Sequence, residues 1–191
     1  EKCNPNYTPA RQAALASDPN GSLHDNGVWS YSSVIGMLLC LSNNTRPDIT
    51  FAASQVARFT HVPRVSHATA IKTLVRYLAR TKDKGLIIKP DETNDLHVWC
   101  DADFAGLFGQ EPGDNPNATC SRYGYIITFS GVPLCWKSQL IQEICHSTLQ
   151  AEHVEMSNAM KAFVPLRGQV DDILIYFKQS LSCSTIRCIV Y

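Results

Sequence analysis

The spacing of apolar residues in the first part of the chain predicts helices. Residues 30–43, "SYSSVIGMLLCLSN", begin with serines that can cap a helix and continue with a mostly apolar body. The segment "RPDITFAASQVARFTH" places Pro47 at a helix start, and "VSHATAIKTLVRYLART" combines an apolar stripe with a basic residue at every fourth position. The preceding turn formers lack periodicity. We therefore expect an irregular lead-in over 1–28 and a helical connection subdomain over 29–94.

The pattern changes to strands in the middle of the chain. "KGLIIKPDETNDLHVWC" predicts two strands separated by a polar turn, and "SRYGYIITFSGVPLCWKSQL" predicts a hairpin. "STLQAEHVEMSNAMKAF" predicts a helix capped by Ser147 or Thr148, followed by a second helical run to about Lys178 and a strand in "STIRCIVY". From His97 onward the expected order is three antiparallel strands, a helix and a further strand. The expected fold class is α+β, with a separate domain over 95–191.

Opposite charges are segregated along a chain that is neutral overall. Residues 46–90 contain nine Lys or Arg and two acids, whereas residues 91–118 contain seven acids and no Lys or Arg. A phosphate-holding surface beside a cation-holding pocket needs opposite fields of this kind. Two solvated faces are the simpler interpretation, and charge runs alone leave both open.

Composition indicates a soluble intracellular protein. The eight cysteines show no C-x-x-C or zinc-ligand spacing, and several lie inside apolar runs, where a free thiol packs as a small hydrophobic group. No apolar stretch approaches the roughly 20 residues of a membrane span, so no membrane partner is expected. The chain begins at Glu1 and stops within a strand-like segment, and we expect it to be part of a longer polypeptide.

Two groups of carboxylates suggest a metal site. In "HVWCDADFAG", Asp101 and Asp103 end a strand, and Glu152 lies in the first turn of the helix that follows three strands. Glu152 can therefore project over the edge of the sheet near Asp101, although support of the helix dipole is an alternative role. Magnesium prefers oxygen ligands and commonly takes one or two carboxylates plus substrate phosphates. Asp101 and Glu152 fit that requirement.

Five segments together resemble the connection and ribonuclease H region of Ty1/copia-type retrotransposon polyproteins. They are "NNTRPDITFAASQVARF", "HATAIKTLVRYLARTKDKGL", "CDADFAG", "SRYGYIITFSGVPLCWKSQ" and "STLQAEHVEMSNAMKA". The corresponding family text is TRPDI, RYLKGTxDxGL, SDADWAG, SGYxFxLxGxxISWxSK and STxEAEYxA. The resemblance runs from about Tyr31 to Phe163 and implies a ribonuclease H-like mixed sheet, incomplete at its C-terminus.

The resemblance also implies roles for individual residues. Asp101 and Glu152 match the first-strand aspartate and the helix glutamate, which are the catalytic metal ligands of that family. Asp103 is expected to assist behind them or to cap the loop, and Arg122 to contact phosphate. Three basic residues are expected to hold the duplex backbone in a sequence-independent way: Lys72, Arg76 and Arg80.

The implied reaction is cleavage of the RNA strand of an RNA·DNA hybrid. Two Mg²⁺ ions about 4 Å apart, or Mn²⁺, would assist in-line displacement at phosphorus. The implied partners are the hybrid and the reverse transcriptase domain of the same polyprotein. The expected location is the cytoplasm, in a retrotransposon particle, or the nucleus.

The chain also departs from the family text. Gln150, His153 and Phe104 replace a glutamate, an aromatic residue and a tryptophan, and none of these changes touches the two expected ligands. The third carboxylate of the family should follow a stretch resembling "IYCDNQSA", but this chain ends with "IRCIVY". Asp171 and Asp172 come too early to replace it, so we expect the 191-residue chain alone to have little or no activity.

Other functions remain open at this point. The chain could be a catalytically inactive hybrid-binding connection module, or a decayed element copy. Asp-x-Asp after a strand also occurs in metal-dependent sugar transferases, but these need several strand-helix units before the motif, and here the preceding region is helical and basic.

Overall fold

The computed structural model divides the chain into two compact units. One unit comprises Glu1–Leu86 and Leu107–Ala118, and the other comprises Ile87–Gly106 and Thr119–Tyr191. The structure describes residues 6–10, 14–25, 27–112, 115, 117–177 and 179–180, together with the backbone of 183–188. The elements are α1 (Tyr31–Asn44), η1 (Pro47–Ile49), α2 (Thr50–Ala57), α3 (Val65–Arg80), β1 (Asp95–Asp103), β2 (Arg122–Phe129), β3 (Val132–Leu140), α4 (Thr148–Tyr176) and β4 (Cys183–Cys188).

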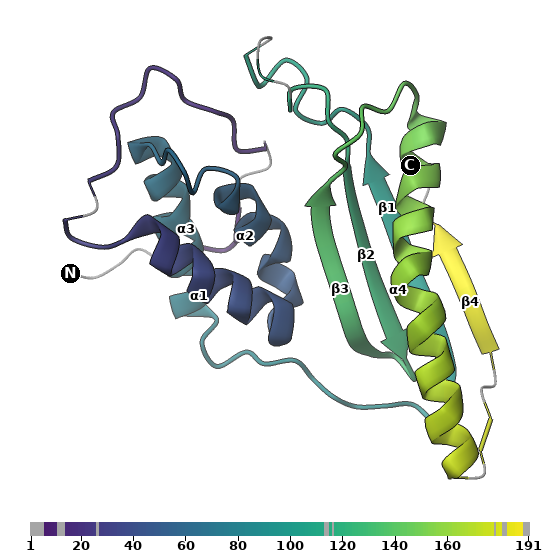
Figure 1. Ribbon diagram of the computed structural model, residues 1–191. Coiled ribbons are helices and arrows are strands. Elements are labelled where there is room, and N and C mark those ends of the chain that lie inside the picture. The colour runs from purple at the N-terminus through teal and green to yellow at the C-terminus, as the bar shows by residue number, and fades with distance from the viewer. Residues whose placement is uncertain are drawn as a thin grey trace. The chain divides into compact units, whose positions relative to one another are not determined.

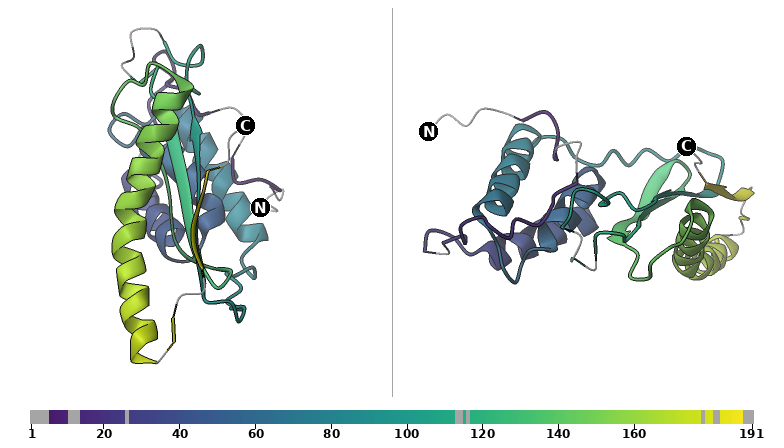
Figure 2. Two further views of the ribbon diagram at one scale, coloured as in Figure 1. Left: turned by 90° about the vertical axis from the view of Figure 1, so that its right-hand side faces the viewer. Right: turned by 90° about the horizontal axis from the view of Figure 1, so that it is seen from above.

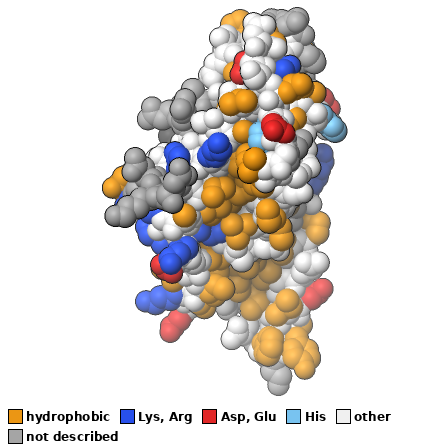
Figure 3. All heavy atoms as spheres, turned by 90° about the vertical axis from the view of Figure 1, so that its left-hand side faces the viewer, with side chains coloured by type: hydrophobic (Ala, Val, Ile, Leu, Met, Phe, Trp, Pro, Cys, Tyr) orange, Lys and Arg blue, Asp and Glu red, His pale blue; other side chains and the backbone are white. Residues whose placement is uncertain are grey.

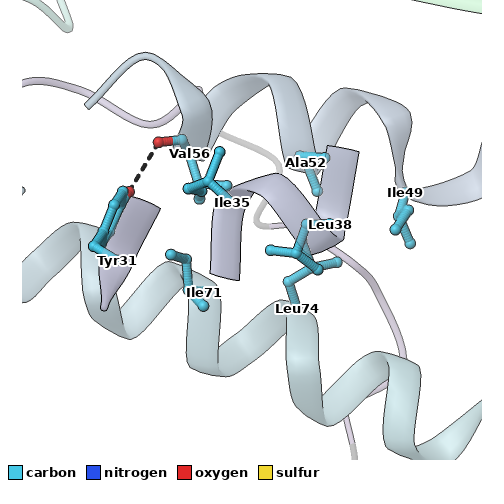
Figure 4. Packing of buried hydrophobic residues seen from close by; sticks show 9 residues of the cluster. Tyr31, Ile35, Leu38, Ile49, Ala52, Val56, Ile71 and Leu74 are labelled. Carbon is cyan, nitrogen blue, oxygen red and sulfur yellow. Dashed lines mark hydrogen bonds between the residues drawn. The ribbon is translucent and has the colours of Figure 1, made fainter. Parts of the chain in front are cut away.

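The three helices of the first unit bury one apolar cluster, shown in Figure 4. Ser30 caps α1 by accepting a hydrogen bond from the backbone N–H of Ser33. The Tyr31 hydroxyl donates to the Val56 carbonyl at 2.8 Å, so the polar tip of this buried ring is satisfied. The helices predicted over 30–43 and 65–81 are confirmed, while the one predicted at Pro47 starts as a 3₁₀ turn.

A charged cluster joins the loop after α1 to the end of α3. All three guanidinium nitrogens of the buried Arg46 donate hydrogen bonds: two reach Asp48, at 2.9 and 2.7 Å, and two reach Thr81, at 2.7 and 3.2 Å. The Tyr77 hydroxyl also donates to Asp48, at 2.8 Å. The Arg46 guanidinium holds the pKa of the Asp48 carboxyl below its ordinary value. The segments "TRPDI" and "RYLART" thus stabilise each other.

The loop over residues 107–118 groups with the helices, although it follows β1 in the sequence. Its Glu111 is 7% exposed and forms an ion pair with Arg58 at 2.7 Å. Glu111 also accepts hydrogen bonds from the Ser17 backbone, the Ser17 hydroxyl and the Asn115 side chain. Burial alone would raise the pKa of Glu111, but these donors more than offset it and the pKa is lowered.

The second unit is built on a four-stranded sheet in the order β3-β2-β1-β4 (Figure 1). Neighbouring strands are antiparallel from β1 to β3, and β4 runs parallel to β1. Ser130 and Gly131 join β2 to β3 with φ angles of 47° and 75°. Positive φ at both central residues is the signature of a type I′ turn, which matches the twist of the flanking strands. The predicted hairpin is therefore confirmed.

One long helix covers one face of this sheet (Figures 1 and 2). The prediction of two helical runs after Ser147 was wrong, because α4 continues through Pro165 to Tyr176. Its buried stripe packs on residues of β1 and β2. The cluster comprises Leu96, Val98, Cys100, Ile127, Ala159 and Phe163. Figure 1 shows the C-terminal end of β1 and the N-terminal turn of α4 at the same end of the sheet.

The first strand predicted in "KGLIIKPDETNDLHVWC" is absent from the structure. Residues 84–94 are irregular, and Ile87 and Ile88 are 82% and 73% exposed. Both edges of β1 are already taken by β2 and β4, so this apolar pair has no place beside it. The observed fold class is α+β, as predicted. Within the described residues, no helix has the length and apolar character needed to cross a membrane.

Candidate metal centre at the end of β1

Asp101 lies two residues from the end of β1, opposite Gly124 of β2. Leu96, Val98 and Cys100 are buried under α4, and side chains alternate between the two faces of a strand. The exposed side chain of Asp101 therefore starts from the face opposite α4, while its backbone hydrogen-bonds to Glu155 of α4. A cation shared by Asp101 and the helix has to lie at the end of the sheet, where side chains from both faces can reach it.

Asp103 folds back over the turn that follows β1. Its carboxylate fills the space that a Cβ on Gly106 would need, so a larger residue there would displace the Asp103 side chain. Ala105 has a φ of 50°, and its backbone N–H donates to the Ser121 hydroxyl. Partial burial of the carboxyl group raises the pKa of Asp103, while Arg122 lowers it and Asp101 raises it. This position suits the loop-capping role considered for Asp103.

The start of α4 is fixed by hydrogen bonds on both sides of its cap. Ser147 accepts from the backbone N–H of Gln150 at 3.1 Å, and the Gln150 side chain accepts from the backbone N–H of His146 at 2.8 Å. Glutamine at this position thus supplies the same acceptor that the glutamate of the family text would. Glu152 is half-buried and follows in the second turn, because the first turn of α4 contains no acid; the expected first-turn position was wrong. The dipole effect falls off within the first turn of a helix, so it gives Glu152 little support there.

Glu155 is a third acid at this end of the sheet, and we did not predict it from the sequence. It is 2% exposed, and its Oε1 has no hydrogen-bond partner. Burial raises the pKa of Glu155 to about 7, a backbone hydrogen bond from Asp101 lowers it, and the charges of Asp101 and Glu152 raise it further. One signal was available: Glu155 stands four residues from both Ala151 and Ala159, inside the buried stripe of the helix.

These acids have the donor chemistry of a site for a hard divalent cation. Asp101 and Glu152 both act on Glu155, which places the three residues around one region. Carboxylate oxygens suit Mg²⁺ and Mn²⁺, and the unpartnered Oε1 of Glu155 offers free lone pairs. Across the part of the chain that the structure describes, no three acids, histidines or cysteines are already gathered around one point. Direct metal binding by Asp101 and Glu152 remains a prediction.

A groove of about 520 Å³ runs between α4 and β3 in the same unit. His153, which follows Glu152, lies in its wall, and Lys137 and Lys161 bring two ammonium groups to it. Neither lysine forms an ion pair with any described residue, and Lys161 donates only to Asn158, at 3.3 Å. Glu143 is also in the lining. The groove is thus polar and carries more positive than negative charge.

The basic residues predicted to hold nucleic acid fall into two groups. Lys72, Arg76 and Arg80 are exposed on α3 in the helical unit, and the guanidinium of Arg80 stacks 3.5 Å from the ring centre of Tyr7. In the view of Figure 3, several Lys and Arg side chains gather toward one edge of the surface that faces the viewer. Arg122 is instead only 7% exposed and donates to the Ser138 hydroxyl at 3.3 Å. This burial leaves little of the Arg122 side chain open to a phosphate.

Comparison with known proteins identifies the family. The chain is 33% identical to a Pol polyprotein from transposon RE1 of Arabidopsis thaliana over 128 residues, which cover 67% of this chain and 8% of that protein. It is 32% identical to one from transposon TNT 1-94 of Nicotiana tabacum over 149 residues, covering 78% and 10%. A transposon Ty5-1 protein of Saccharomyces cerevisiae is 29% identical over 140 residues, covering 73% and 43%.

The chain belongs to the copia-type retrotransposon Pol polyproteins.

Membership of this family rests on sequence similarity to individual proteins. No family model matches the chain, and no solved structure matches it. The chain spans about a tenth of the length of the Pol polyproteins from RE1 and TNT 1-94. The resemblance to TRPDI has a structural basis, because the ion pair of Arg46 and Asp48 anchors the end of α3. The Asp-Ala-Asp segment has no such structural role, because its two acids are exposed at the end of β1.

Proposed function

We propose that the chain is the connection and ribonuclease H-like part of a retrotransposon polyprotein that cleaves the RNA strand of RNA·DNA hybrids. Asp101 and Glu152 would hold Mg²⁺, or Mn²⁺, at the end of the sheet. The observation that supports this best is that three acids, from β1 and the N-terminal part of α4, interact in one region, where Glu155 forms no ion pair with a described residue. Like charges gather in this way where a cation or a reacting group is to be bound.

The residues of this chain would bind and position the hybrid. When bound, divalent cations supply charge stabilisation at the phosphodiester and lower the pKa of the attacking water. Asp101 would bind from the end of the strand, and Glu152 from a helix whose N-terminus is capped by Ser147. Lys137 and Lys161 would hold the phosphate backbone in the groove beside α4.

The helical unit offers a second basic surface for the duplex. Lys72, Arg76 and Arg80 would contribute sequence-independent phosphate contacts, and such contacts weaken as salt rises. Selectivity for a hybrid requires contacts to 2′-hydroxyls on one strand, because these distinguish RNA from DNA. In the parent, the reverse transcriptase domain of the same polyprotein would deliver the hybrid inside the cell.

A hybrid-binding module without cleavage activity is the second candidate. The observation that favours it is the direction of Asp101, whose side chain starts from the face opposite α4, together with the lack of a gathered three-ligand group within the described residues. Such a module would bind hybrids in the absence of divalent cations and would leave the RNA strand intact.

Cleavage of a labelled hybrid by the parent polyprotein separates the two candidates. We expect D101N and E152Q each to lower the cleavage rate at least a hundredfold, while hybrid binding measured in EDTA changes less than twofold. D172N is the matched control, because Asp172 is an exposed acid further along α4, and it should cleave normally. Normal turnover in D101N would reject the assignment, and magnesium-independent binding with no cleavage by the unmodified parent would favour the binding module.

A further inference from the structure

Glu155 is buried at a cost that no contact within the described protein removes. It lies on the sheet-facing stripe of α4 with Ala151 and Ala159, and its side chain is almost wholly enclosed. Its Oε1 has no hydrogen-bond partner among the described residues. A buried polar group without a partner costs about 1–3 kcal/mol, and more when it is charged. Alanine, the residue in the family text STxEAEYxA, would avoid this cost.

The groups around Glu155 increase this cost. From β1, the backbone of Asp101 supplies a hydrogen bond, but the carboxylate of the same residue repels the charge of Glu155. From α4, Glu152 repels it as well. Glu155 forms no ion pair with a described residue, and its Oε1 accepts no hydrogen bond from one. A divalent cation would satisfy the free oxygen and relieve both repulsions together, and a proton on Glu155 is the alternative that would relieve the repulsions.

We propose that Glu155 is a third carboxylate ligand of the cation that Asp101 and Glu152 hold. This inference rests on the proposed function and extends its ligand set. Three carboxylates without a cation repel one another, so they are not expected to converge before binding. The three side-chain torsions of each glutamate allow Glu152 and Glu155, one helical turn apart, to swing toward the end of β1 when a cation binds. Oxygen ligands of this type suit Mg²⁺ and Mn²⁺.

A purely structural Glu155 would behave differently. It would take up a proton, remain neutral beneath α4, and gain nothing from a divalent cation. Replacing it with glutamine would then leave cation affinity unchanged, because an amide fills the same space as the protonated acid. A measurement of cation affinity therefore distinguishes a metal ligand from a buried residue with a purely structural role, and it does not require nuclease activity.

Titration of the 191-residue chain with Mn²⁺, followed by electron paramagnetic resonance of the free ion, tests the proposal. We expect E155Q to weaken binding about tenfold or more, which is the usual minimum for loss of a group that supports a metal site. E155A is the second variant, since the family text predicts that alanine is tolerated here. D172N, on the exposed part of α4, should bind as the unmodified chain does. Thermal melting with and without Mn²⁺ gives an independent readout, in which E155Q should lose most of the metal-induced rise in Tm.

The outcomes distinguish this inference from the proposed function. If D101N and E152Q weaken Mn²⁺ binding while E155Q and E155A bind normally, Glu155 is not a ligand, and the proposed function stands without it. If none of the four variants changes the affinity, or the unmodified chain binds no Mn²⁺ at millimolar concentration, the inference about Glu155 is overturned, whereas the proposed function is overturned by normal hybrid cleavage in the D101N parent. If E155Q and E155A alone among helix variants weaken binding, Glu155 is the helix ligand and the assignment of Glu152 is wrong.

Discussion

Two buried glutamates in this chain have opposite environments. Glu111, in the helical unit, accepts hydrogen bonds from Ser17, Arg58 and Asn115, and its pKa is lowered. Glu155, on α4, has an oxygen without a partner and two acidic neighbours, and its pKa is raised to about 7. Both side chains are almost fully enclosed. Burial alone therefore does not decide the protonation state of a carboxyl group here.

The different environments indicate different roles: the charge of Glu111 stabilises the fold, whereas Glu155 is a candidate for a functional site. Glu111 holds the loop over residues 107–118 against the helices, and a carboxylate with this set of donors is complete without any ligand. Glu155 leaves bonding capacity unused at the end of β1. Acids whose pKa is raised by burial and by neighbouring negative charges concentrate at functional sites. The predictions below test the contrast, beginning with the largest expected effect.

Replacing Arg58 should destabilise the helical unit strongly. In R58M, Glu111 would remain enclosed without its cation, and breaking a buried pair in this way costs about 3 kcal/mol or more. Urea unfolding at pH 7 measures the change, with K82M, at an exposed lysine, as the control. The double variant R58M/E111Q should recover part of the loss, because it removes the isolated charge. A loss below 0.5 kcal/mol would show that the ion pair does not support the loop.

Replacing Glu155 should stabilise the metal-free chain at high pH. The pKa of Glu155 is about 7 in the folded chain and about 4.5 in the unfolded chain. The folded chain therefore loses stability as pH rises from 4.5 through 7. E155Q should therefore raise the free energy of unfolding by roughly 2–3 kcal/mol at pH 8 in EDTA, and by almost nothing at pH 4. An equal gain at both pH values would contradict the unsatisfied charge.

The same pH series on Glu111 should give the opposite sign. Its pKa is lowered on folding, so its contribution is present above the unfolded pKa and is lost as pH falls below it. E111Q should destabilise the chain near pH 7 and have a smaller effect at pH 3. Urea midpoints across the series measure both variants under one set of conditions. If E111Q and E155Q change stability in the same direction at pH 8, the contrast between the two sites fails.

The groove beside α4 should give the smallest effect. K137A and K161A are each expected to weaken binding of an RNA·DNA hybrid several-fold, and to lower the slope of log affinity against log salt by about one. Fluorescence anisotropy in EDTA measures both quantities. K89A, an exposed lysine in the same unit but outside the groove, is the control. Equal effects from all three lysines would indicate a diffuse charge effect.

Much of the fold could be predicted because local and tertiary preferences agree. The helix over Val65–Arg80 has an uninterrupted amphipathic pattern, and the hairpin has its turn residues between alternating strands. The prediction failed where tertiary context decides. "GLII" has strand propensity, but β1 has no free edge for it, and Pro165 reads as a helix break although α4 continues through it.

The candidate site was only partly accessible from sequence. The resemblance marked Asp101 and Glu152 because their motifs are specific in combination. Glu155 escaped notice because the family text has alanine there, and because an acid in a helix is ordinarily on a solvated face. The burial of Arg122 could not be predicted either, because the neighbouring sequence does not indicate which part of a strand is covered in the assembled sheet. Both depend on which face packs, which only the assembled sheet and helix determine.

The most direct test of the account is the position of a bound cation. Crystals of the chain soaked with Mn²⁺ and measured for anomalous scattering would locate it. We predict a peak at the end of β1, roughly 2.0–2.6 Å from carboxylate oxygens of both Asp101 and Glu152. An Asp101 carboxylate that stays on the face opposite α4, with no peak at this end of the sheet, would contradict the account.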